Sequence, residues 1–169
     1  MKSSTKRLII GTGNILLSDE GVGIHIVRQL QRQQTKDKEL FHNTEFVDIG
    51  TSSFDIISYI NNGVTKVALI EKVVIIDCMK ADGYLPGTVF KLTPDDLRKR
   101  QKEKYSLHQM ELMDTLRMLS IIEKLPEILI LGIVPEDINK FSTKLSDSIA
   151  EKFPVILSKI KKEIVDFFK

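Results

Sequence analysis

The sequence lacks the features that would assign it to several specialised classes of protein. It has one cysteine, Cys78, among 169 residues, so no disulfide can form within the chain. A chain without disulfides is typical of a reducing compartment. No stretch approaches the roughly 18 apolar residues that a membrane-spanning helix needs, and the apolar run after the polar, basic segment 1–7 is too short for a signal peptide. We therefore expect a cytoplasmic protein that does not enter a membrane.

A strong charge of either sign is also missing. The 25 basic and 23 acidic residues leave a net charge of +2, which gives no reason to expect a nucleic acid or an anionic membrane as partner. The length suits a single domain, residues 1–169, with a sizeable core. No self-complementary apolar stripe is left over, so we expect a monomer.

The segment 8–30 has the pattern of the first half of a βαβ unit. A short apolar run, Leu8 to Ile10, is broken by Gly11 and Gly13. Apolar residues then return with helical spacing, which predicts a buried strand, a glycine turn and an amphipathic helix. Two acidic residues, Asp19 and Glu20, lie in the junction between strand and helix.

Strand and helix patterns continue to alternate along the chain. Further strands are predicted at 45–49, 73–76, 88–92 and 127–134, with helical segments between and after them. This alternation predicts an α/β fold, a twisted, mostly parallel sheet of about five strands between helices. Because 88–92 follows its predecessor through a tight Pro/Gly turn, we expect it to pair antiparallel at an edge.

Acidic residues follow three of the predicted strands. Glu20 lies in the first loop, Asp48 near the end of the second strand and Asp77 after the central one. A buried carboxylate needs a partner, so Asp77 either caps a neighbouring backbone or binds a ligand. Together with His108, at the start of a later helix, Glu20 and Asp77 form a set that binds a divalent transition ion. The sequence alone does not show that the three converge, and it contains no H-E-x-x-H or paired C-x-x-C motif.

Other chemistry is less well supported by the sequence. A dinucleotide fingerprint beginning at Gly11 would need a third glycine where Leu16 stands, and the acidic pair in this loop would repel phosphates. His25 and His42 fit structural or surface histidines. Cys78 fits a small core residue, because a neighbouring anion such as Asp77 raises the pKa of a thiol.

Six segments of the chain resemble motifs of one family, the nickel–iron hydrogenase maturation endopeptidases. The opening signature is similar to G-T-G-N-I-L-L-S-D-E-G-V-G at 11–23. The others, in chain order, are V-D-I-G-T (47–51), V-V-I-I-D (73–77), P-G-T-V (86–89), S-L-H-Q (106–109) and G-I-V-P-E (132–136). The opening motif and the histidine motif are the specific ones.

The resemblance implies a concrete activity. Members of the family remove the C-terminal extension of the hydrogenase large-subunit precursor after nickel insertion, and are classed as aspartic-type peptidases with a phosphorylase/hydrolase-like fold. Their metal ligands correspond to Glu20, Asp77 and His108. The implied ion is the nickel already bound in the precursor, so no permanent cofactor is expected. Asp19 or Asp48 is a candidate general base, and a water polarised directly by the metal is the alternative.

Two other functions remain open at this point. A non-catalytic, metal-sensing maturation scaffold would bind the same precursor through the same three residues without cutting it. A nucleotide-binding α/β enzyme would use the glycine turn and would be stabilised by a dinucleotide.

Overall fold

The computed structural model describes residues 6–65, 70–99, 107–121 and 125–169. Its elements in chain order are β1 (Lys6–Gly11), the 3-10 helix η1 (Ser18–Gly21), α1 (Val22–Gln33), β2 (Thr44–Asp48), α2 (Asp55–Thr65), β3 (Ile70–Cys78), β4 (Val89–Leu92), α3 (Pro94–Lys99), α4 (Leu107–Leu119), β5 (Glu127–Ile133) and α5 (Asp147–Phe168). This order agrees with the alternation that the sequence predicts.

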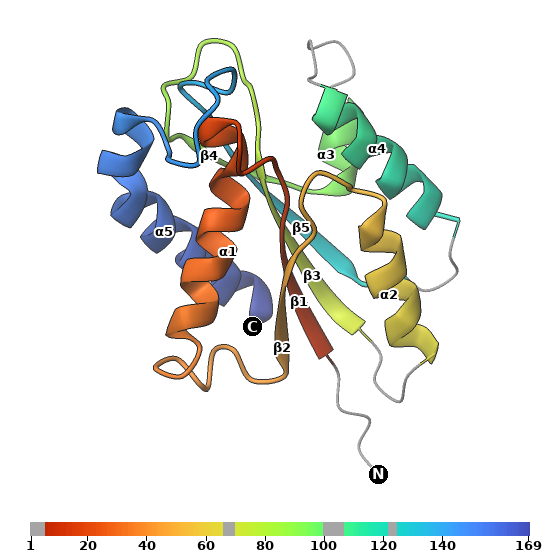
Figure 1. Ribbon diagram of the computed structural model, residues 1–169. Coiled ribbons are helices and arrows are strands. Elements are labelled where there is room, and N and C mark those ends of the chain that lie inside the picture. Colours follow the sequence, from red (N-terminus) through yellow and green to blue (C-terminus); the bar gives the residue numbers. More distant parts are fainter. Residues whose placement is uncertain (1–5, 66–69, 100–106, 122–124) are drawn as a thin grey trace.

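The strands form one five-stranded sheet in the order β2-β1-β3-β5-β4. The three pairs β1–β2, β1–β3 and β3–β5 are parallel, whereas β4 pairs antiparallel with β5. The α/β fold class is therefore confirmed, and so is the antiparallel edge strand. Because the parallel strands run in one direction, their carboxyl ends and the loops that follow them lie together at one edge of the sheet, at the top of Figure 1.

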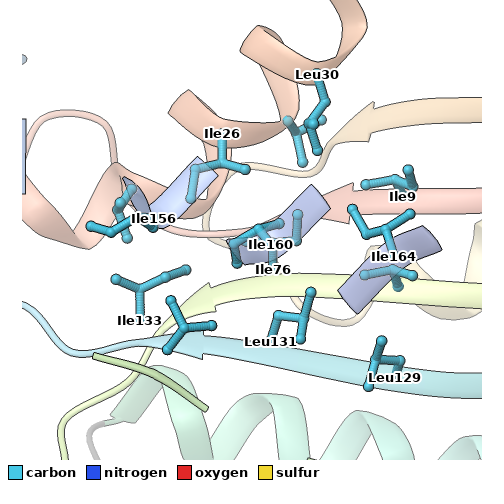
Figure 2. Packing of buried hydrophobic residues seen from close by; sticks show 14 of the residues in the cluster. Ile9, Ile26, Leu30, Ile76, Leu129, Leu131, Ile133, Ile156, Ile160 and Ile164 are labelled. Carbon is cyan, nitrogen blue, oxygen red and sulfur yellow. The ribbon is translucent and has the colours of Figure 1, made fainter. Parts of the chain in front are cut away.

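Helices cover both faces of the sheet (Figure 1). Successive side chains of the strands point to opposite faces, so each face has its own hydrophobic core. Ile9 of β1 packs with the residues of α1 and α5, whereas its neighbours Leu8 and Ile10 pack with α2 and α4. Figure 2 shows the first of these cores, in which Ile26 of α1 and Ile160 of α5 meet the strands. Because the central strands are covered on both faces, they can be continuous apolar runs.

The carboxyl end of α5 is attached to the sheet by two cations. Lys72 donates to the backbone oxygen of Phe167 at 2.7 Å, and Arg7 donates to that of Phe168 at 3.1 Å. Each cation also lies over the ring of the same phenylalanine, at 5.2 Å and 4.7 Å from its centre. These contacts satisfy the last carbonyls of the helix and favour the negative end of its dipole. In the part of the chain that the structure describes, no helix has the length and apolar character to cross a membrane.

Candidate active site

Backbone hydrogen bonds join the loops at the carboxyl ends of β1, β2 and β3. The N–H of Thr12 donates to the oxygen of Ile76 at 3.1 Å, and the N–H of Gly13 donates to that of Gly50 at 2.9 Å. The segments that the sequence predicts to carry functional residues are thus held side by side.

Two glycines allow η1 and α1 to approach these strand ends closely. A Cβ on Gly23 would lie 2.3 Å from the oxygen of Ile76, and a Cβ on Gly13, where φ is +133°, would lie 1.9 Å from the oxygen of Glu20. Both distances are too short for any other residue. The glycines of the opening motif therefore accommodate the chain's own backbone, which does not favour the hypothesis that they receive a dinucleotide.

Asp77 is a fully buried carboxylate at the end of β3. Its Oδ1 accepts a hydrogen bond from the N–H of Cys78 at 2.8 Å. Burial raises the pKa of Asp77 to about 8; the bond from Cys78 opposes this rise, and the negative charge of Glu20 adds to it. At neutral pH the site therefore disfavours the ionised form of Asp77, and a cation bound there would reverse this preference.

Glu20, in η1, is half-buried, and its negative charge contributes to the raised pKa of Asp77. His108 belongs to the first turn of α4, which begins at the same edge of the sheet as the strand ends (Figure 1). The side chain of His108 lies outside the described residues. Among the side chains that are described, no three of His, Cys, Asp or Glu are placed to hold a metal ion. The three-ligand set of Glu20, Asp77 and His108 therefore stays a prediction.

Asp19 has a different environment from its neighbour Glu20. Its side chain has no exposed surface. The oxygen Oδ2 accepts bonds from the N–H groups of Glu136 and Asp137 at 3.0 and 2.9 Å, and Oδ1 accepts one from Ser146 at 2.7 Å. A carboxylate engaged by three backbone donors joins the β1–η1 segment to the β5–α5 loop, and it is poorly placed to take a proton from water.

Asp48 lies at the end of β2 and is the more accessible of the two candidate bases. Its Oδ2 accepts a hydrogen bond from Arg28 of α1 at 2.8 Å, and its Oδ1 accepts one from the N–H of Gly50 at 3.0 Å. The side chain is 31% exposed. The carboxylate of Asp48 is therefore accessible to solvent at the edge of the sheet where the parallel strands end.

The remaining candidate residues fit structural roles. Cys78 is buried, and burial raises the pKa of its thiol, as do the negative charges of Asp77 and Glu20. His25 is half-buried in α1; burial lowers the pKa of its imidazole, and the charge of Arg28 lowers it further. These environments keep the thiol protonated and the imidazole neutral at pH 7, so neither suggests a nucleophile.

One structural role could not be found from the sequence. The adjacent acids Asp19 and Glu20 are visible, but nothing in the sequence distinguishes the carboxylate that binds backbone from the one that faces the site. The difference between their roles depends on the β5–α5 loop, which lies more than 100 residues further along the chain.

Comparison with known proteins connects this arrangement to one family. Residues 24–163 match the family model described as hydrogenase maturation protease. The chain is 30% identical over 132 residues to the hydrogenase 2 maturation protease of Escherichia coli, covering 78% of this chain and 74% of that protein. It is also 26% identical over 162 residues to a putative hydrogenase maturation protease of Methanocaldococcus jannaschii, covering 92% and 96%.

Other relatives are longer than this chain. The hydrogenase expression/formation protein HupD of Thiocapsa roseopersicina is 27% identical over 154 residues, and the chain spans 64% of its length. Among solved structures, the NiFe hydrogenase maturation protease HybD of Thermococcus kodakarensis superposes with a TM-score of 0.71 at 26% identity, covering 95% of this chain and 99% of that one.

Proposed function

The chain belongs to the hydrogenase maturation protease family, and we propose on this premise that it is an endopeptidase acting on a nickel–iron hydrogenase large-subunit precursor. The reaction is removal of the C-terminal extension of the precursor after nickel has been inserted. Glu20 and Asp77, joined by His108 as the family resemblance implies, bind the precursor's nickel. The ion is part of the substrate, and the protein needs no metal cofactor of its own.

The observation that carries this proposal is the pairing of Glu20 with Asp77. Asp77 is fully buried, and burial is the main cause that raises its pKa to about 8; the negative charge of Glu20 adds to the rise. A divalent cation relieves both burial and repulsion, and carboxylates together with an imidazole suit a transition metal. The pair therefore has the properties of a cation site that is filled only when the correct substrate arrives.

Hydrolysis also needs a water molecule that can lose a proton. We assign the general base to Asp48, because its carboxylate is exposed at the rim whereas that of Asp19 is held by three backbone donors. Asp48 would take the proton as the water oxygen attacks the scissile carbonyl carbon. The same proton would then pass to the amine that leaves when the C–N bond breaks.

A non-catalytic scaffold is the alternative function. It would use the same carboxylate pair to sense nickel in the precursor and would release the precursor uncut. The two functions differ in one product, the free C-terminal peptide, so a mass measurement separates them.

The test is a cleavage assay followed by mass spectrometry, with a precursor prepared with and without nickel. We expect loss of a C-terminal peptide only from the nickel-loaded precursor, and at least a 100-fold loss of rate in Glu20→Ala, because that variant lacks one ligand. Glu39→Ala is the matched control, since Glu39 is an exposed glutamate in the segment between α1 and β2, away from the carboxyl ends of the strands. Wild-type binding without any change in mass would favour the scaffold, and wild-type activity in Glu20→Ala would remove Glu20 from the ligand set.

Two further properties complete the proposal. We place the reaction in the cytoplasm and the protein in solution as a monomer. The single buried thiol of Cys78 supports a reducing compartment. Size-exclusion chromatography with light scattering would test the monomer.

A further inference from the structure

Two apolar side chains are exposed where the β1–η1 segment meets the β5–α5 loop. Phe141 is 79% exposed and Leu16 is 44% exposed. The N–H of Ser142 donates to the oxygen of Leu16 at 2.9 Å, and the N–H of Ser18 donates to the oxygen of Ser142 at 2.8 Å. These bonds form a short parallel bridge between Leu17 and Ser142, and its register makes Leu16 and Phe141 neighbours across the two segments.

The two segments are firmly joined beneath this pair. Asp19 accepts bonds from three backbone N–H groups of the β5–α5 loop, and the hydroxyl of Ser18 donates to the oxygen of Lys144 at 3.2 Å. Single exposed apolar residues are common on protein surfaces and need no explanation. Here two exposed apolar residues come from segments that are far apart in the sequence. The two segments are hydrogen-bonded to each other, and the two side chains bury little of their own surface.

The pair is also close to the candidate active site. Leu16 precedes Glu20 by four residues, and four residues of extended chain span at most about 14 Å. Lys140 and Ser142, the chain neighbours of Phe141, line a pocket of about 340 Å³ together with Ser18, so this pocket adjoins the two segments that carry the pair. A substrate segment with its scissile bond at Glu20 therefore reaches Leu16 and Phe141 within about four residues. Figure 1 shows the β5–α5 loop, in blue, beside η1, in red, at this edge of the sheet.

We infer that Leu16 and Phe141 form an apolar subsite that binds one apolar side chain of the precursor, located within about four residues of the scissile bond. This inference rests on the proposed function, because it assumes that the precursor enters the site at Glu20. A rigidly supported aromatic side chain is the kind of residue that dominates binding energy at an interface. The subsite would determine which peptide bond of the precursor lies at the site, while Glu20 and Asp77 bind the nickel.

Steady-state cleavage of the nickel-loaded precursor tests the subsite. We expect Phe141→Ala to raise KM about tenfold with kcat changed less than twofold, because truncation of an aromatic anchor weakens binding. Leu16→Ala should raise KM by a smaller factor, about threefold, because the side chain is less exposed and smaller. Ile121→Ala is the matched control, since Ile121 is 83% exposed beyond the far end of α4, and its KM should equal that of the wild type.

Substitutions in the precursor identify the occupant. Each apolar residue within four positions of the scissile bond is replaced by serine in turn. One replacement should raise KM about tenfold with the wild-type enzyme and have no further effect with Phe141→Ala, which is the signature of two groups in contact. Melting temperatures of the Phe141→Ala and Leu16→Ala variants should match the wild type, because exposed side chains contribute little to stability.

The possible failures are distinguishable. If the wild type cleaves and Phe141→Ala has an unchanged KM, the subsite does not exist while the proposed function stands. If the wild type does not cleave, the proposed function fails. The dissociation constants of the precursor from the wild type and from Phe141→Ala then test whether the subsite exists. Equal binding by wild type and Phe141→Ala would overturn it, and about tenfold weaker binding by the variant would support it.

Discussion

Asp19 and Asp77 are two fully buried carboxylates at the same edge of one sheet, yet their surroundings are opposite. Asp19 accepts bonds from three backbone N–H groups at 2.7–3.0 Å. The Oδ1 of Asp77 accepts a bond from the N–H of Cys78, and burial, with a smaller contribution from the negative charge of Glu20, raises the pKa of Asp77 to about 8. The first carboxylate is held by backbone donors from a distant loop, whereas burial makes the ionised form of the second unfavourable. The difference shows how one edge of a sheet can combine a rigid support with a reactive site.

Removing the stabilised carboxylate should have the larger effect on folding. We expect Asp19→Ala to lower the free energy of unfolding by about 3–5 kcal/mol, because three hydrogen bonds to a buried charge are lost and their donors lose their acceptor. Urea denaturation of the variant and the wild type measures this difference.

Asp137→Ala is a suitable control for Asp19→Ala. The carboxylate of Asp137 also accepts two backbone bonds, from Asn139 and Lys140, which lower its pKa, but Asp137 is partly exposed whereas Asp19 is fully buried. Its removal should destabilise the protein much less. Equal losses in the two variants would mean that burial is not what makes Asp19 important.

Neutralising the other carboxylate should stabilise the protein while abolishing its activity. The pKa of Asp77 is raised from 3.8 to about 8 in the folded protein, so between these values the folded state holds a proton that the unfolded state releases. Stability therefore falls as pH rises through this window and levels off above pH 8. We expect Asp77→Asn to be more stable than the wild type at pH 8.5 by roughly 2–4 kcal/mol.

The pH dependence supplies the control for Asp77→Asn. At pH 4.5 the wild-type carboxyl is already protonated, so the two proteins should melt at similar temperatures. Thermal denaturation at both pH values checks this expectation. A stability difference that does not change with pH would show that Asp77 is ionised in the folded protein. Asp77→Asn should also fail to cleave the nickel-loaded precursor.

The smallest effect on stability is expected for the exposed carboxylate of the same edge. Asp48→Asn weakens a partly exposed ion pair with Arg28, so the free energy of unfolding should change by about 0.5 kcal/mol or less. Cleavage should fall by about 100-fold if Asp48 is the general base. Arg28→Gln is the control, because it removes the ion pair and keeps the carboxylate. Wild-type cleavage by Asp48→Asn would favour a water polarised directly by the metal.

Periodicity and motif composition were sufficient to predict most of the fold. The apolar runs of β1, β3 and β5 indicated buried parallel strands, because strands covered on both faces carry apolar residues without alternation. The Pro86–Gly87 turn indicated the antiparallel edge strand, which the structure confirms as β4. These signals are local, so a single sequence contains them. The comparisons confirm the family resemblance carried by the motifs.

The environment of each acidic residue was decided by tertiary structure. Asp19 and Glu20 are adjacent in the sequence, and only the β5–α5 loop, which supplies three N–H donors, makes the first structural. The pairing of Glu20 with Asp77 depends on the close approach of α1 to the end of β3, which Gly23 permits. The exposure of Leu16 beside Phe141 depends on the bridge between two distant segments. The sequence thus determined the strands, the helices and the residue types at the site, because these follow from local pattern. Folding decided which carboxylate is held by backbone donors and which has a raised pKa, because both depend on groups brought together from distant parts of the chain.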